Sequence, residues 1–193
     1  MPTHPLPAVE GISLAFATPR ALPKPSRLGE RVGVLDIAFA AEGGGQSFEK
    51  TTERFIRRLG DRLVAWVDHH DSRYHDRFAD DGRFVLVTKA QHGACPELIT
   101  PTLVARYGRP DTIVCHVDFD GLASAAKWIR GGQEPYAGCD ADARAVDTCT
   151  GKLSAVGVQL DRALRARPRD TTLFETVVRH LVSGAAGSTT PAA

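Results

Sequence analysis

The strongest pattern in the sequence is an apolar run that passes without a break into an acid and two imidazoles. Leu63-Val64-Ala65-Trp66-Val67 is followed at once by Asp68, His69 and His70. A continuous apolar run bounded by polar residues is typical of a strand buried on both faces of a parallel sheet. We therefore expect the polar residues at the carboxyl edge of such a sheet, where ligands bind in open α/β folds.

Two further runs repeat this pattern, one over residues 32–35 and one over residues 112–115. The polar residues that follow them are Asp36 after the first run, and His116, Asp118 and Asp120 after the second. Parallel neighbouring strands would bring all three ends to one edge of the sheet. Four carboxylates and up to three imidazoles would then meet there, and so much like charge is costly unless a cation neutralises it. The pattern predicts a metal site.

The segments around these strands have helical spacing of apolar residues or a further strand pattern. The predicted helices cover residues 47–59, 96–107, 121–129, 141–148, 153–164 and 173–181, and a further strand covers residues 83–88. Strands that alternate with helices favour an α/β fold with a mainly parallel sheet. We predict a three-layer sandwich of this class.

The 193 residues are enough for one domain with a proper core, and we place it at residues 31–183. Residues 1–30 are rich in proline and are expected to form an arm, in which Ile12–Phe16 could add a short edge strand. Residues 184–193 are small or polar, and we expect a disordered tail.

Composition narrows the functional classes. There are 24 basic and 23 acidic residues, so no basic bias indicates a long nucleic-acid track. No apolar run approaches the length of a membrane span. The four cysteines form no C-x-x-C pair, and we expect them to be reduced in a cytoplasmic protein. Zinc binding through Cys139 and Cys149 remains an alternative without clean spacing.

The polar strand ends resemble the motifs of the DHH phosphoesterase family. Val67-Asp68-His69-His70 is similar to the motif that names the family, and the segment His116-Val117-Asp118-Phe119-Asp120-Gly121-Leu122-Ala123-Ser124-Ala125 is similar to the H-x-D-x-D-G-x-x-S-A motif of its RecJ-like branch. Asp36 fits the lone acid of the second motif, and Asp147-Thr148 fits the fourth. Four motifs on suitable elements are far more specific than one tripeptide.

The chain departs from the family in two respects. The D-x-D motif normally comes first along the chain, whereas here it follows Asp36 and the DHH motif, so the order of strands looks circularly permuted. Family members also carry a second domain with a G-G-G-H-like signature, and no such signature follows residue 151. Substrate specificity is then expected from local loops, the N-terminal arm or another subunit, which leaves a homodimer open.

The resemblance implies a site for two Mn²⁺ ions, with Mg²⁺ or Zn²⁺ as alternatives. The ligands that it implies are Asp36, shared between the two ions, Asp118 on one ion, and Asp120, His69 and Asp147 on the other. His116 is a further candidate ligand. His70 would contact the scissile phosphate or act as a general acid, and Asp68 would orient the ring of His69.

Four residues are candidates for holding the phosphates of a substrate, although each could equally be an ordinary loop or surface residue. They are Lys89, His92, Arg144 and Gly44. The expected activity is two-metal hydrolysis of a phosphodiester or phosphoanhydride in a small phosphorylated substrate, such as a nucleotide, a dinucleotide or a short single-stranded oligonucleotide. The alternative is a catalytically weak module that keeps the metal site and binds a nucleotide or a partner.

Overall fold

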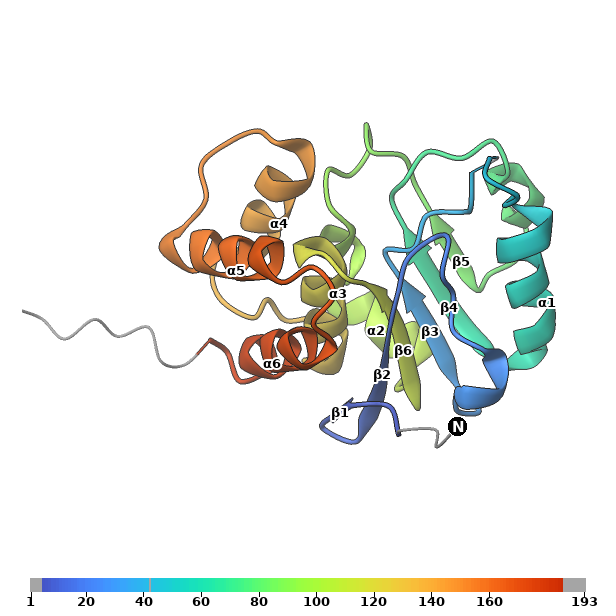
Figure 1. Cartoon of the computed structure of the whole chain (residues 1–193), viewed down its shortest axis with the longest axis horizontal. Coiled ribbons are helices and arrows are strands. Elements are labelled where there is room, and N and C mark those ends of the chain that lie inside the picture. Colours follow the sequence, from blue (N-terminus) through green and yellow to red (C-terminus); the bar gives the residue numbers. More distant parts are fainter. Residues whose placement is uncertain (1–4, 42, 186–193) are drawn as a thin grey trace, which may run out of the picture.

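The structure, a computed structural model, describes residues 5–41 and 43–185 (Figure 1). Its centre is a six-stranded sheet in the order β1-β2-β6-β3-β4-β5. The strands are β1 (Ala8–Val9), β2 (Ile12–Ala17), β3 (Val32–Leu35), β4 (Leu63–Asp68), β5 (Phe84–Leu86) and β6 (Thr112–His116). Only β1 runs antiparallel to its neighbour. The predicted α/β class with a mainly parallel sheet is confirmed.

The three strands with polar ends are neighbours in the middle of the sheet, as the sequence predicted. Leu35, the last residue of β3, pairs with Cys115 of β6 on one side and with Val67 of β4 on the other. The ends of the three strands are therefore level. Asp36, which follows β3, is therefore level with His116 at the end of β6 and with Asp68 at the end of β4.

Helices lie on both faces of the sheet (Figure 1). The α-helices are α1 (Arg54–Leu59), α2 (Pro101–Tyr107), α3 (Phe119–Ile129), α4 (Cys139–Thr148), α5 (Ala155–Ala166) and α6 (Thr171–Val182). A π-helical turn, Glu49–Glu53, leads into α1, and short 3₁₀ turns cover Pro25–Arg27, Gly60–Arg62, His75–Phe78 and Cys95–Leu98. None of the described helices is long and apolar enough to span a bilayer.

Two separate clusters of buried apolar side chains fill the faces of the sheet. One includes Phe48, Phe55 and Trp66, beneath α1. The other includes Leu122 of α3 and Phe174 of α6. This arrangement, with the sheet between two helical layers, is compatible with a three-layer sandwich.

The N-terminal segment differs from the arm that we expected. Ile12–Ala17 is an inner strand, which pairs with β6 from Ser13 opposite Thr112 to Ala17 opposite His116, while β1 lies outside it. The burial of Ile12, Leu14 and Ala17 explains the difference, because these side chains complete the core on both faces. Gly184 and Ala185 still hydrogen-bond to α6, and the rest of the predicted tail lies outside the described residues.

The predicted helix over residues 96–107 is two elements. A 3₁₀ turn ends at Leu98, and α2 begins only at Pro101. Proline lacks an N–H and disfavours helical geometry in the residue before it, so Thr100 stays extended. The Thr100 hydroxyl accepts a hydrogen bond from the N–H of Leu103 at 3.2 Å and caps the new helix.

Helix α3 approaches the end of β6 closely at Gly121, where no side chain intervenes. A Cβ atom at this position would lie 2.6 Å from the carbonyl oxygen of His116. We expect Gly121→Ala to lower the free energy of unfolding by about 1–3 kcal/mol, because the clash outweighs the better helix propensity of alanine. Urea denaturation measures this change.

Gly33→Ala is the matched control, because a Cβ atom there would meet nothing closer than Pro110 at 3.8 Å. It should change the free energy of unfolding by less than about 1 kcal/mol. If Gly121→Ala is as stable as this control, the helix start is not held against the strand as we describe.

Candidate metal centre

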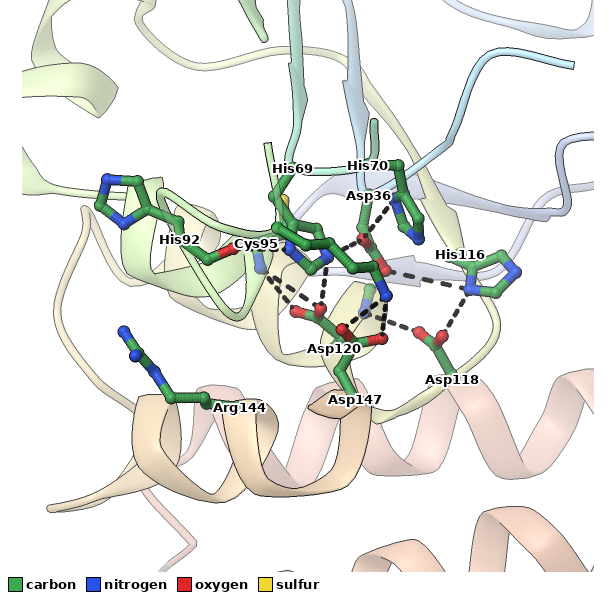
Figure 2. Close-up of polar contacts among 12 residues, drawn as sticks. Asp36, His69, His70, His92, Cys95, His116, Asp118, Asp120, Arg144 and Asp147 are labelled. Atoms are coloured by element: carbon green, nitrogen blue, oxygen red, sulfur yellow. Dashed lines mark hydrogen bonds and ion pairs between the residues drawn. The ribbon is translucent and has the colours of Figure 1, made fainter. Parts of the chain in front are cut away.

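Acidic and imidazole side chains from three strand ends and two helices converge at the carboxyl edge of the sheet (Figure 2). They are Asp36 after β3, Asp68, His69 and His70 at the end of β4, His116, Asp118 and Asp120 at the end of β6 and the start of α3, and Asp147 near the end of α4. Each residue that the sequence assigned to metal binding lies in this cluster.

Asp36 is at the middle of the cluster and is almost fully buried. Its Oδ1 lies 3.4 Å from Nε2 of His69 and 3.8 Å from Nδ1 of His70. Its Oδ2 lies 3.9 Å from Nδ1 of His116. The backbone of Asp36 has φ of +57°, which is uncommon for a residue with a side chain. Strained backbone of this kind is concentrated at functional sites.

Several buried polar atoms of the cluster have no hydrogen-bond partner in the described part of the chain. They are both carboxylate oxygens of Asp36 and Nε2 of His69. The His69 nitrogen also lies 3.1 Å from Oδ2 of Asp120, but without the geometry of a hydrogen bond. Buried polar atoms are almost always paired, so such a group calls for a ligand that the protein itself does not supply. A cation between these atoms would satisfy them together.

The ligand atoms form three groups, in each of which they lie within 4.8 Å of one another. The groups are Asp36 with His69 and His70, Asp36 with His116 and Asp118, and His69 with Asp120 and Asp147. Asp36 and His69 each belong to two of these groups, and Asp36 is the carboxylate that could be shared between two ions. Mixed carboxylate and imidazole ligands fit Mn²⁺, Mg²⁺ or Zn²⁺ by their chemistry.

The partner that orients His69 is not the one that we expected. Nδ1 of His69 lies 3.0 Å from the backbone carbonyl oxygen of His92. Asp68 instead places Oδ1 at 2.8 Å from Nδ1 of His70. The side chains of His69 and His70 leave the strand end in different directions, so the buried Asp68 carboxylate reaches only His70. A backbone carbonyl is a common partner of a ligating imidazole, and it fixes the ring in the same way.

The start of α3 holds two carboxylates in different roles. Asp118 caps the helix, since its Oδ1 accepts from the N–H of Gly121 at 3.0 Å, and its Oδ2 lies 2.6 Å from Nδ1 of His116. Asp120 is buried and accepts from the N–H of Cys95 at 3.0 and 3.3 Å. The contact with the Cys95 amide could not be predicted from the sequence, because almost every residue has a backbone N–H and its residue type does not indicate this role.

The charges in the cluster shift its titration. Burial, together with the charges of Asp120, Asp118 and Asp68, holds the pKa of Asp36 well above its usual range. Burial alone would lower the pKa of His69, but the adjacent Asp120 carboxylate outweighs it and raises the pKa to about 9. Burial raises the pKa of Asp120 to about 6 despite the opposing effect of His69. Without a metal, the imidazolium of His69 therefore supplies part of the missing positive charge.

Lys89 supplies a second internal cation. Its Nζ lies 2.7 Å from Oδ2 and 3.0 Å from Oδ1 of Asp147. Burial opposes its charge, but the contact with Asp147 outweighs that effect and raises the pKa of Lys89. A metal ion bound to Asp147 would have to compete with this ammonium group or displace it toward the substrate.

The other candidates for phosphate binding lie apart from the cluster or face away from it. The side chains of Arg144 and His92 both turn toward Glu97, at 2.5 Å and 3.4 Å, and Figure 2 shows them to one side of the carboxylates. Gly44 lies in a turn closed by mutual backbone hydrogen bonds of Gly43 and Gln46. Among the four, only Lys89 reaches a cluster residue with its side chain.

All four cysteines are free, with Cys149 exposed and the others buried. The groups of metal-ligating side chains within residues 5–41 and 43–185 contain only Asp and His. The zinc alternative through Cys139 and Cys149 therefore has no support in the described geometry.

Comparison of the chain with protein-family models, with curated proteins and with solved structures gave no match. The function has to be inferred from the site itself.

Asp36→Asn tests whether this carboxylate binds metal. The substitution keeps the size of the side chain but removes the charge shared by two ligand groups. We expect most bound Mn²⁺ to be lost, as measured by metal analysis after gel filtration. Asp80→Asn, an exposed acid on the surface, is the control and should keep full metal content. Full occupancy in Asp36→Asn would show that Asp36 is not a ligand.

The raised pKa of His69 gives a prediction about pH. Its Nε2 must lose a proton before it can bind a metal, and with a pKa of about 9 the metal-free protein carries that proton at pH 7. Mn²⁺ binding at pH 7 should therefore release about one proton or more per chain, and the affinity should rise with pH up to about 9. Titration calorimetry in buffers of different ionisation enthalpy counts the protons. Binding without proton release would contradict this combination of a protonated His69 in the metal-free protein and a ligating His69 in the metal-bound one.

Proposed function

We propose that this chain is a metal-dependent phosphoesterase, which hydrolyses a phosphodiester or phosphoanhydride bond in a small phosphorylated substrate. The observation that carries the proposal is the set of buried oxygens of Asp36 and the Nε2 of His69, which lack hydrogen-bond partners and face each other. Carboxylates at strand ends, with imidazoles beside them, are typical ligands of divalent cations. Divalent cations at an accessible site catalyse the hydrolysis of phosphate esters and anhydrides.

The residues fit a two-ion site. Asp36, His116 and Asp118 would hold one ion, and His69, Asp120 and Asp147 would hold the other. Asp36, whose Oδ1 lies 3.4 Å from Nε2 of His69, would be shared between the two ions. When bound, two such cations would supply a nucleophilic hydroxide and neutralise the charge on the transferred phosphoryl group. Mn²⁺ is the preferred choice, with Mg²⁺ or Zn²⁺ as alternatives.

His70 is the residue best placed to act on the substrate. Its side chain is 27% exposed, whereas that of His69 is fully buried. The buried Asp68 accepts from Nδ1 of His70, so the ring is held in one orientation with Nε2 as the atom that exchanges a proton. From this position, Nε2 would contact a non-bridging phosphate oxygen or protonate the leaving oxygen.

The order of the strands supports the resemblance to the DHH phosphoesterases. Across the sheet, β6 with the D-x-D motif lies beside β3 with the lone Asp, which lies beside β4 with the DHH motif. This spatial order equals the order in which the family has these motifs along the chain. Moving the first strand to a late position in the sequence leaves the sheet order unchanged. We therefore propose a permuted DHH-like fold with three layers.

One observation favours a second function. The ammonium group of Lys89 forms an ion pair with Asp147. Such a pair would be expected in a module that has kept the site, holds fewer ions, and binds a nucleotide or a partner without hydrolysing it. Mn²⁺-dependent release of p-nitrophenol from bis-p-nitrophenyl phosphate discriminates between the two. Turnover supports the enzyme, and metal binding without turnover supports the module.

Substitution of the two histidines separates metal binding from chemistry. We expect His69→Ala to lose metal, because the ring lies 3.4 Å from Asp36 and 3.1 Å from Asp120. We expect His70→Ala to keep most metal but to lose about 10²-fold or more in kcat, the usual contribution of an acid catalyst. Metal analysis and kinetics on the same preparations measure both effects. Equal metal loss in the two variants would contradict this division.

A basic cleft that sequence reasoning missed is a further candidate for holding the phosphates of a substrate. The cleft has a volume of about 330 Å³ and lies between residues 20–25 and the first turns leading into α1. Its basic residues are Arg20, Lys24, Lys50, Arg54 and Arg58. Lys50, Arg54 and Arg58 follow each other at intervals of four residues, a signal that the balanced total charge concealed.

We predict a higher kcat/KM for a dinucleotide than for a single-stranded 20-mer, since a cleft of this size would hold one or two phosphates. Measurements at two salt concentrations make the comparison, because long polyanions show a steep dependence on salt. Greater efficiency on the 20-mer that collapses with salt would contradict the prediction. In that case, the double substitution of Arg54 and Arg58 by alanine should remove the preference if the cleft is the track.

A further inference from the structure

A second cavity opens directly beside the carboxylate cluster. It has a volume of about 330 Å³ and lies between the loop after β6, the end of α4, and α5 with the residues that follow it. The lining residues are Val117, Asp118, Phe119, Val146, Asp147, Asp161, Leu164, Arg165 and Pro168. No part of the proposed metal chemistry uses its apolar side.

The apolar side of this pocket is fixed by the core. Phe119 and Leu164 are buried, at 1% and 6% exposure, and both belong to the cluster of apolar side chains on the α3 face. Val117 and Val146 are half-buried and pack against the same cluster. The floor is therefore part of the packed core, and it offers a surface that an apolar ligand group could cover.

The opposite wall belongs to the candidate metal centre. Asp118 is in the ligand group with Asp36 and His116, and Asp147 is in the group with His69 and Asp120. A phosphate held by cations at these groups would lie next to the pocket, because Asp118 and Asp147 both line it. Its organic substituent would then be close to the apolar floor.

We propose that this pocket binds the planar aromatic group of a phosphate ester, such as a nucleobase or a phenyl ring. The inference rests on the proposed function and narrows its substrate class to esters, as opposed to pyrophosphate and other inorganic phosphoanhydrides. A pocket of about 330 Å³ is at the small end of ligand sites and suits one ring system.

The apolar floor of the pocket disfavours the inorganic substrates. A second phosphate group in the pocket would lie against the apolar side chains of Val117, Phe119, Val146 and Leu164. Placing an anion there without a partner is costly. The charge of Arg165 is balanced by Asp161, whose two oxygens lie 2.9 and 2.8 Å from its Nε, so the pair brings no net positive charge to the pocket. A neutral ring meets none of these penalties.

The test is direct binding of products and analogues to the Mn²⁺-loaded protein. Titration calorimetry compares phenyl phosphate and adenosine monophosphate with methyl phosphate and pyrophosphate. We expect the two ring compounds to bind on the order of tenfold more tightly than methyl phosphate or better, because the ring surface is buried. Pyrophosphate, which can chelate the cations with both of its phosphates, is the reference for binding to the metal alone.

A substitution at the pocket wall locates the effect. Val146→Trp would fill the space and bring the affinity ratio of phenyl to methyl phosphate close to one. Ala141→Trp places the same side chain on an exposed position of α4 and should leave that ratio unchanged. Circular dichroism verifies that both variants are folded, and the comparison of ligands on the unchanged protein does not depend on either variant.

Each outcome has a separate meaning. Equal binding of phenyl and methyl phosphate overturns the ring pocket but leaves the phosphoesterase intact. Absence of Mn²⁺-dependent binding of all four compounds overturns both the proposed function and the pocket.

Discussion

The buried carboxylate of Asp36 is the constraint on which the rest of the site depends. It lies at the end of the central strand, its two oxygens have no hydrogen-bond partner in the described part of the chain, and imidazoles approach it from both neighbouring strands. Isolating a charged carboxylate in this way costs several kcal/mol unless a cation or a proton accompanies it. Asp36 also has a positive φ, which is uncommon for a residue with a side chain.

The surroundings show how the protein meets that cost without a metal. The pKa of Asp36 is raised well above its usual range, mainly by burial, and His69 is held protonated with a pKa of about 9. Lys89 neutralises Asp147 from the other side. Bound protons and an ammonium group thus supply the positive charge that divalent cations would supply at the same place. Since these groups can be displaced or lose a proton, the site is suited to an exchangeable cation.

The sequence predicted the centre of the sheet well because the evidence is local. Each apolar run is continuous, so the strands and the polar residues at their ends can be identified from the sequence. Parallel pairing of the strands then places Asp36, Asp68 and His116 at the same height along the sheet. It did not predict β2 as an inner strand, since the alternation over residues 12–16 is equally typical of an edge. It also could not find contacts between distant segments. The carbonyl of His92 on His69 and the pairing of Lys89 with Asp147 depend on loop geometry that residue types do not encode.

The start of α3 connects the metal cluster with the apolar pocket. Gly121 lets the helix approach the end of β6, and Asp118 belongs to the cluster and also lines the pocket.

The central claim is that divalent cations bind at Asp36. Anomalous diffraction from a crystal grown with Mn²⁺ tests it most directly. We predict two anomalous peaks within ligand distance of Asp36, with His69 on one of them. Strong peaks elsewhere, with Asp36 free of metal, would contradict the account.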